Sequence, residues 1–430
     1  MTTSLTIDEI PDYLKKSELY KNIDSDESFD VPDKFFRKEL KISTFDDLAA
    51  YIFIFDFWIL EEIPNEIYKW VMENRTEINI NLLNEQFPMN LLVDEIKIII
   101  DTPDDKLCNY FSSVGNLLLL KFAHENECMW NERTCDSAAK NGQLECLVYA
   151  HENGCVWHKT ACIYAALYGH LECLVYASEN GCDWLAEEIC DRAAENGHLE
   201  CLKYAHENGC EWDRFTCSSA AMNGQLECLK YAAENGCEWI AGTACREAAK
   251  NGHLECLKYA HENGCSWSSW TCNYAAKNGH LECLKYAHEN GCGWFNEKMC
   301  YYAAENGHLE CLKYAHENGC LWDNETCNSA ASNGHLECLK YAHENGCEWD
   351  RFTCSSAASN GHLECLKYAH ENGCEWRVST CNSAASNGHL ECLKYAHENG
   401  CEWDKRTCQY AAKNEHLECL KYAHDNECPE

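Results

Sequence analysis

A unit of about 27 residues repeats about a dozen times from residue 108 to residue 430. One copy reads NGHLECLKYAHENGCEWDRFTCSSAAS and spans Asn333 to Ser359. Self-similarity at such a period is typical of solenoids, in which each copy packs only on its neighbours. With 430 residues, the chain is long for a single compact core, and a stack of copies escapes that limit. We therefore predict a solenoid, an architecture whose long surface commonly binds other macromolecules.

One leucine, in the LEC motif or its equivalent, gives the register of the copies. It recurs at Leu117, Leu144, Leu171, Leu199, Leu226, Leu254, Leu281, Leu309, Leu336, Leu363, Leu390 and Leu417. The steps are 27 or 28 residues, and the longer steps begin at Leu171, Leu226 and Leu281. In each long copy the extra residue lies between the Trp and the next Cys, as from Trp184 to Cys190. Insertions at one point per copy indicate a loop there.

Each copy divides into two short helices. In the copy quoted above, apolar residues at helical spacing predict one helix from His335 to Asn345. Gly346 follows, and glycine ends helices because it takes the left-handed conformation without a steric penalty. A second helix is predicted from Thr353 to Ser359, before another Asn–Gly pair. Its small Ala357 and Ala358 would let neighbouring helices approach closely.

The pattern AAxNGHLECLKYAHENGCEW resembles the ankyrin repeat pattern AAxxGHLEVVKLLLExGAD. The residues that fall on family positions are Ala357, Ala358, Gly361, His362, Leu363 and Glu364. The resemblance covers about three quarters of the chain and implies an all-α, ankyrin-like helical-repeat solenoid. The family repeat has about 33 residues, and here the segment between the Trp and the next helix is short and lacks Thr–Pro. We expect the projecting β-hairpin of the family to be reduced to a tight turn.

The region before the repeats has neither cysteine nor repeat. We divide it into residues 1–40, polar and partly disordered, and residues 41–107, a helical cap or adaptor-like region; residues 108–430 form the array. Phe45 to Asn74 resembles the last helices of BTB/POZ and Skp-type adaptor domains, on Leu48, Ala49, Tyr51, Ile54 and Leu60. That resemblance implies a substrate receptor whose partners include ubiquitin-ligase components. The alternative is a cap that shields the apolar face of the first repeat.

The net charge and the hydropathy of the chain limit the classes of partner and the cellular location that we expect. The net charge is −36, which repels phosphate backbones and argues against nucleic acid as a partner. We expect no membrane partner, because the N-terminus lacks a signal-like apolar run and the stretch YIFIFDFWIL is too short to span a bilayer and contains Asp56. A cytoplasmic protein is expected. Near-identical copies, such as DRFTCSSAA at both Asp213 and Asp350, resemble ankyrin-like sets of giant viruses and some protists, so a viral chain would lie in the host cell cytoplasm.

The 35 cysteines follow the repeat, about three per copy. In one copy they are Cys338 in LEC, Cys347 in NGC and Cys354 in TC. We interpret them as reduced core residues, since each falls where a small apolar side chain should pack. A disulfide array and a metal array that pairs cysteines with His335 or His343 remain as alternatives. We predict no metal and no cofactor, because the repeats contain no CxxC pair.

Variation among copies points to a binding strip. It concentrates after the Trp and at the two residues before Ala–Ala, which the ankyrin resemblance places on the turn and on the exposed side of the first helix. Aromatic and arginine side chains dominate interface energetics. The predicted partner-binding residues are Phe215, Trp270, Tyr274, Phe295, Tyr301, Tyr302, Arg377, Arg406 and Tyr410. Neutral variation of exposed positions is the competing interpretation.

Enzymatic motifs are absent from the sequence. It has no Gly-rich phosphate loop, no GxSxG and no HExxH. The Trp, such as Trp349, and the repeat histidines recur in nearly every copy, which favours packing and hydrogen-bonding roles over a single catalytic site. The sequence therefore predicts an interaction scaffold for a partner protein rather than an enzyme. A cysteine-rich metal-binding or redox repeat protein is the alternative.

Overall fold

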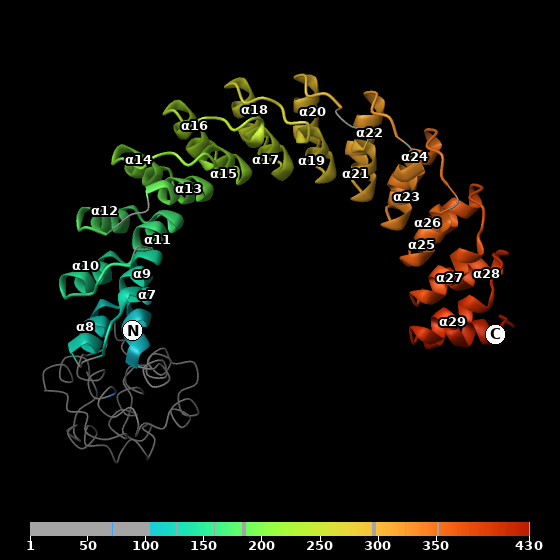
Figure 1. Cartoon of the computed structure of the whole chain (residues 1–430), viewed down its shortest axis with the longest axis horizontal. Helices are drawn as coiled ribbons and strands as arrows, with labels where there is room; N and C mark the ends of the chain where they lie inside the picture. Colours follow the sequence, from blue (N-terminus) through green and yellow to red (C-terminus); the bar gives the residue numbers. More distant parts are fainter. Residues whose placement is uncertain are drawn as a thin grey trace, which may run out of the picture. The chain divides into compact units, whose positions relative to one another are not determined.

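The computed structural model describes residue 71 and residues 104–125, 128–158, 160–182, 186–294, 298–322, 324–350 and 352–429. Within these ranges every regular element is an α-helix, and twenty-four helices follow one another from α7 to α30 (Figure 1). The predicted all-α solenoid is confirmed. Residues 1–40 and nearly all of residues 41–107 lie outside the described ranges, as does the adaptor-like segment. No helix among the described residues is both long and apolar enough to cross a membrane.

The chain divides into two compact units, Met1–Leu185 and Ala186–Glu430. The helices described in the first unit are α7 (Asp104–Val114), α8 (Leu117–Glu125), α9 (Glu132–Lys140), α10 (Leu144–Glu152), α11 (Ala161–Tyr168) and α12 (Leu171–Glu179). The odd-numbered helices of the second unit are α13 (Ala186–Asn196), α15 (Thr216–Met222), α17 (Thr243–Asn251), α19 (Thr271–Lys277), α21 (Met299–Glu305), α23 (Asn324–Ser332), α25 (Thr353–Ser359), α27 (Val378–Ser386) and α29 (Lys405–Lys413). Its even-numbered helices are α14 (Leu199–Glu207), α16 (Leu226–Glu234), α18 (Leu254–Glu262), α20 (Leu281–Glu289), α22 (Leu309–Glu317), α24 (Leu336–Glu344), α26 (Leu363–Glu371), α28 (Leu390–Glu398) and α30 (Leu417–Asp425).

The predicted helix pair matches the observed one. Helix α25 has the expected bounds, and α24 lies within one residue of the predicted ends. After α24, Gly346 has φ 87° and the N–H of Cys347 donates to the carbonyl of Ala342 at 2.9 Å. This is the bonding of a Schellman end, in which a left-handed glycine lets the chain satisfy the last carbonyls. The sequence signal of the helix stop is therefore correct.

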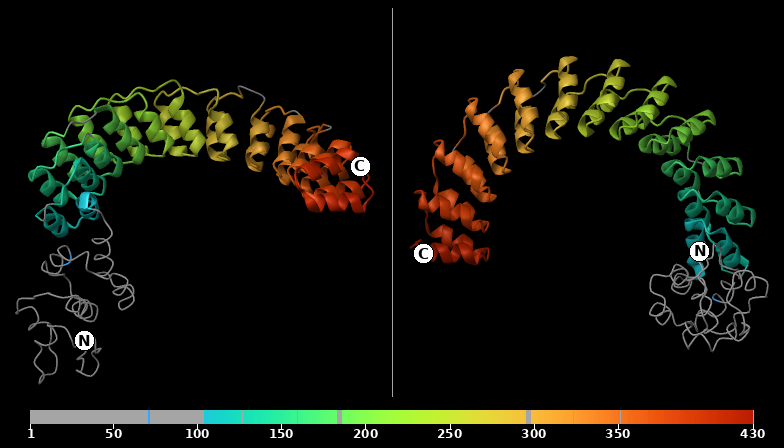
Figure 2. Two further views of the ribbon diagram at one scale, coloured as in Figure 1. Left: turned by 60° about the horizontal axis from the view of Figure 1, so that its bottom comes forward. Right: turned by 180° about the vertical axis from the view of Figure 1, so that it is seen from behind.

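Odd-numbered and even-numbered helices form two layers of the second unit (Figures 1 and 2). Successive odd helices contact one another more extensively than successive even helices do. The cause is visible in α25, where Ala357 and Ala358 are fully buried and bring no bulk between the backbones. The even layer carries Leu339 in the interior and larger side chains at the contact between copies, where Tyr341 of α24 meets His316 of α22 edge-on.

A histidine from one copy covers the glycine of the copy before it. Gly307 has φ 75°, and a Cβ built there would lie 2.5 Å from Nδ1 of His335. Gly307 is thus required twice, by its backbone conformation and by the approach of the imidazole. The glycine at the other helix end, Gly346, has φ 87° and no neighbouring atom within 4 Å of such a Cβ. The first kind of glycine therefore carries a packing constraint between copies that the second lacks.

Candidate functional site

Four of the predicted partner-binding residues lie together on the odd layer. Trp270 is the N-cap of α19 and is 40% exposed, Tyr274 lies one turn later, and Tyr301 and Tyr302 are in the adjacent α21. The rings of Trp270 and Tyr274 have centroids 5.7 Å apart, and those of Tyr301 and Tyr302 are 5.4 Å apart. The three tyrosines are half-buried rather than fully exposed, because lysine side chains pack against them.

These lysines connect the aromatic residues of neighbouring helices. Lys250 of α17 lies 5.7 Å from the ring centroid of Tyr274, and Lys277 of α19 lies 5.5 Å from that of Tyr302. Lys298, the N-cap of α21, lies 5.8 Å from the ring of Tyr301. Cations within about 6 Å of a ring face are attracted by its quadrupole. We use the name lysine–aromatic strip for the residues of these contacts, Lys250, Trp270, Tyr274, Lys277, Lys298, Tyr301 and Tyr302.

Tyr301 is also held by its own helix. Its hydroxyl donates to Oε1 of Glu305 at 2.9 Å. Burial, and then this hydrogen bond to a carboxylate, raise the pKa of Tyr301 above its ordinary value. The phenol is therefore neutral at physiological pH and is presented in a fixed orientation.

The other predicted residues are not part of this strip. Phe215, the N-cap of α15, is 43% exposed and lies beside the guanidinium of Arg214, 4.5 Å from its ring centroid. Arg406 and Tyr410 are exposed on α29. Arg377 is the exposed N-cap of α27. Phe295 lies outside the described residues.

Sequence reasoning missed Phe352 and the three lysines. Phe352 is the N-cap of α25, is 45% exposed, and lies 5.7 Å from the guanidinium of Arg377. It occupies the same position in its copy as Phe215, so the duplicated DRFTCSSAA segment gave a signal for it. The lysine contacts could be found only by comparing two successive copies. Lys277 follows Ala–Ala in one copy, and its partner Tyr302 precedes Ala–Ala in the next.

The even layer repeats a cluster of His, Trp and Tyr. His316 stacks on Trp322 with centroids 3.6 Å apart, and Tyr341 of the next even helix meets both rings edge-on. The Tyr341 hydroxyl and Nδ1 of His316 are 3.3 Å apart, within hydrogen-bonding distance. In several copies, the indole N–H of the repeated Trp donates a hydrogen bond to the next copy. In Trp376, Nε1 donates to the backbone carbonyl of Asn399 at 3.0 Å. The repeated Trp thus packs between copies.

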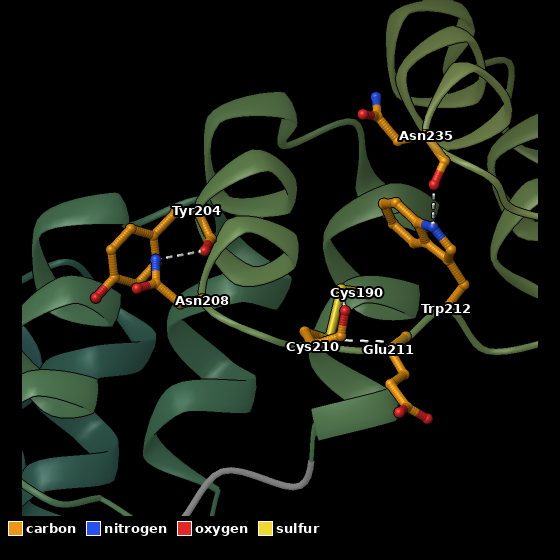
Figure 3. The surroundings of a disulfide bond; sticks show 7 residues. All are labelled: Cys190, Tyr204, Asn208, Cys210, Glu211, Trp212 and Asn235. Atoms are coloured by element: carbon orange, nitrogen blue, oxygen red, sulfur yellow. Dashed lines mark hydrogen bonds between the residues drawn. A yellow bond between two sulfur atoms is a disulfide. The ribbon is translucent and has the colours of Figure 1, made fainter.

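The cysteines are all buried, and one pair departs from our expectation. Cys190 of α13 and Cys210, which follows α14, are joined by a disulfide, as Figure 3 shows. The interpretation of every cysteine as a reduced core residue is therefore wrong for this pair. Its reason is spatial: the TC cysteine of one helix lies against the NGC cysteine twenty residues later. The remaining cysteines are buried thiols.

No cluster of three or more His, Cys, Asp or Glu side chains suited to a metal ion occurs among the residues that the structure describes. The pairs of His and Cys that the sequence suggested as metal ligands do not assemble into such a cluster there.

Comparison with known proteins decides the family. The sequence pattern described as ankyrin repeats (3 copies) matches residues 190–269, 272–353 and 354–428, more than half of the chain. The chain belongs to the ankyrin repeat family. Membership implies a role in protein–protein interaction, and ankyrin repeat proteins are generally binding scaffolds rather than enzymes.

Among solved structures, the crystal structure of the human ASB11 ankyrin repeat domain is similar to this ankyrin repeat protein. The two are 20% identical, with a TM-score of 0.33, over 36% of this chain and 83% of the other. The search of curated proteins gave no match.

Proposed function

We propose that this ankyrin repeat protein captures a partner protein on the lysine–aromatic strip. The observation that carries the proposal is a pair of equivalent cation–ring contacts, in which Lys250 of α17 meets Tyr274 of α19 and Lys277 of α19 meets Tyr302 of α21. Aromatic side chains bury a large area and are enriched in the residues that dominate binding energy. Rings already held by lysines lose little conformational freedom on binding, which favours affinity.

The charge of the strip differs from that of the rest of the chain. Helices α17, α19 and α21 with their N-cap residues carry basic Arg246, Lys250, Lys277 and Lys298 against acidic Glu247 and Glu305. The even helices α18, α20 and α22 each carry two glutamates and one lysine. The strip is therefore locally basic within a chain of net charge −36. Such a surface suits a partner segment that presents carboxylates beside aromatic or apolar side chains.

Two single substitutions test the strip. The partner is first captured from the native cell by proximity labelling on the full chain, and its affinity is then measured with purified protein. Trp270→Ala and Tyr302→Ala should each weaken binding about tenfold or more, since interface anchors contribute about 1–2 kcal/mol or more. The unfolding midpoint should change little for the exposed Trp270, because surface substitutions usually change stability by less than about 0.5 kcal/mol. It should change more for the half-buried Tyr302, and that variant should still unfold in one cooperative transition.

Phe352→Ala is the matched control. Phe352 is an exposed aromatic N-cap, like Trp270, but belongs to α25, outside the strip. Its substitution should leave affinity unchanged. Equal losses for Phe352→Ala and Trp270→Ala, or no loss for either strip variant, would remove the strip as the binding site.

A finer role, substrate receptor of a ubiquitin ligase, rests on the resemblance of Phe45 to Asn74 to adaptor domains. In that role the N-terminal region would dock the ligase and the repeats would hold the substrate. A pull-down of a cullin by the full chain tests it, with a variant that carries Leu48→Asp and Ile54→Asp as the control. Capture that both chains support equally, or neither supports, contradicts the adaptor role and leaves the scaffold role intact.

A further inference from the structure

The cysteines fall into two structural classes that the sequence alone did not separate. Eleven copies have an LEC cysteine on the even helix. All the other cysteines form pairs whose members are twenty residues apart in the sequence. Each pair joins a TC cysteine to the next NGC cysteine. The pairs are 108–128, 135–155, 162–182, 190–210, 217–237, 245–265, 272–292, 300–320, 327–347, 354–374, 381–401 and 408–428. The extra residue of the long copies falls outside this interval, so the spacing never changes.

The fold places the two members of each pair together. In one pair, Cys245 lies in α17 and Cys265 lies in the turn after α18. The Cys245 thiol reaches the carbonyl of Cys265 at 3.6 Å, and Cys354 reaches that of Cys374 at 3.8 Å. The same contact joins Cys327 to Cys347 at 3.5 Å.

One pair is already oxidised. The disulfide between Cys190 and Cys210 joins Cα atoms 6.5 Å apart, within the span of a disulfide. The pair occupies the same two places in its copy as Cys245 and Cys265 do in theirs. We propose that the twenty-residue cysteine pairs are repeated modification sites, in which a hydroperoxide converts the two thiols to a disulfide that joins an odd helix to the turn of the next copy.

The two sulfurs of a pair are chemically unequal. The thiol of Cys245 hydrogen-bonds to the sulfur of Cys265, and this bond, with backbone N–H groups at the start of α17, lowers the pKa of Cys265 to about 7. The same bond and burial raise the pKa of Cys245. Cys265 is therefore the attacking thiolate and Cys245 the thiol that resolves the intermediate. In the even helix, burial raises the pKa of Cys256 to about 11, which keeps that sulfur protonated.

The reaction balances with peroxide as the oxidant. The Cys265 thiolate attacks one oxygen, the O–O bond breaks, and a sulfenic acid and hydroxide form. The hydroxide takes the proton of Cys245. The resulting thiolate attacks the Cys265 sulfur, and the S–O bond breaks to release a second hydroxide, which takes up the proton that Cys265 first gave to solvent. Two thiols and one hydrogen peroxide thus give one disulfide and two waters.

Tryptic mapping of the full chain separates the two cysteine classes. Cleavage after lysine and arginine places Cys237 and Cys245 in residues 231–246, and Cys265 and Cys272 in residues 259–277. The peptide NGHLECLK arises twice, from residues 251–258 with Cys256 and from residues 278–285 with Cys283, and in both its single cysteine is an LEC cysteine. The chain is reduced with dithiothreitol, desalted under native conditions, treated with hydrogen peroxide, blocked with N-ethylmaleimide under denaturing conditions and digested without reduction.

Peroxide should link peptide 231–246 to peptide 259–277 and leave NGHLECLK carrying N-ethylmaleimide. Cys265→Ala should abolish that link, whereas Cys256→Ala, which empties an equally buried position, should preserve it. Dithiothreitol should reverse it. Absence of the link in the wild-type chain, its survival in Cys265→Ala, or equal oxidation of NGHLECLK would each overturn the proposal. Circular dichroism of both variants before oxidation verifies that they retain the helical content of the wild type.

Discussion

The even and odd helices of the second unit repeat with different fidelity. Seven of its even helices, α14, α18, α20, α22, α24, α26 and α28, share the sequence LECLKYAHE. The odd helices keep their cysteine and Ala–Ala but differ around them, as α17 and α21 show. The even helices use their repeated Tyr and His for contacts between copies and expose their glutamates, as Glu337 and Glu344 of α24 show, whereas the odd helices bury their repeated Cys and Ala–Ala. The variable residues of the odd layer include the half-buried Tyr302 and the exposed N-cap residue Trp270. The comparison teaches that sequence uniformity here marks packing between copies, and that variety in the odd layer marks the positions available to a partner.

The glycines between the helices offer the strongest way to break this uniform packing. Gly307→Ala would place a Cβ 2.5 Å from the His335 ring in addition to requiring positive φ, whereas Gly346→Ala requires only positive φ. The backbone penalty is about 1–2 kcal/mol, and overpacking adds about 1–3 kcal/mol. We expect a loss of about 2–5 kcal/mol for Gly307→Ala and about 1–2 kcal/mol for Gly346→Ala, measured by urea unfolding.

Glu415 shows that the backbone penalty alone is tolerated, since it holds this position in the last copy with φ 61°. The steric origin can be isolated with the double variant Gly307→Ala/His335→Ala. It should lose less than the two single variants together, because removal of the imidazole gives the new methyl group room. Equal losses for Gly307→Ala and Gly346→Ala would contradict the role of the histidine contact.

The contribution of the His–Trp stack to stability can be tested in the same way, with a smaller expected effect. Two copies of the chain naturally lack the histidine. Helix α16 has Ala233 where most copies have histidine and α12 has Ser178. The Trp of the α16 copy, Trp239, still donates to the carbonyl of Asn263 at 2.9 Å. His343→Ala would reproduce this arrangement at a site where the rings of His343 and Trp349 are 3.6 Å apart. Aromatic pairs contribute about 0.5–1.5 kcal/mol beyond burial, so we expect a loss of about 1 kcal/mol.

The reverse variant, Ala233→His, should raise stability by a similar or smaller amount, since Trp239 is already in place. Thermal and urea unfolding of both variants and the wild type measure the two effects. A destabilised Ala233→His protein would show that the histidine stack depends on features that α16 lacks.

The sequence predicted the features that recur within every copy, which are the helix bounds and the packing residues. It missed the contacts between particular residues of different copies. Helix bounds around Gly346, the close Ala357 and Ala358 contacts and the packing role of Trp349 all follow from one copy read alone. The cation–ring contact of Lys277 with Tyr302 joins two helices, and the pairing of Cys190 with Cys210 joins a helix to the turn after the next one, so no single copy reveals them. Trp270 and Tyr302 were predicted from their variability, but their assembly into one strip with Lys250 needed the stacking geometry. All nine partner-binding residues stay predictions, and Phe295 also lies outside the described residues.

Acidification should weaken the same inter-copy packing through the histidines that cover the glycines. Burial lowers the pKa of His280 and of His308 below the ordinary value of about 6.5. The unfolded chain therefore takes up a proton at higher pH than the folded chain does. Their contribution to stability is complete above about pH 6.5 and is lost as the pH falls toward the lowered folded values. Stability should decrease from pH 7.5 to pH 5.5, a window above the ordinary pKa values of carboxylates, about 4.

Two natural copies make the test specific, because Gln143 and Gln225 take the histidine position and their side chains cover Gly115 and Gly197 in the same way. The double variant His280→Gln/His308→Gln should therefore fold, and its urea midpoint should change less with pH than that of the wild type. Gln225→His should have the opposite effect and steepen the dependence, since it adds a titrating ring over Gly197. Stability decreases on acidification because burial of these imidazole rings over the glycines disfavours their protonated form. A pH dependence that is the same in all three proteins would assign the acid sensitivity to groups outside this contact.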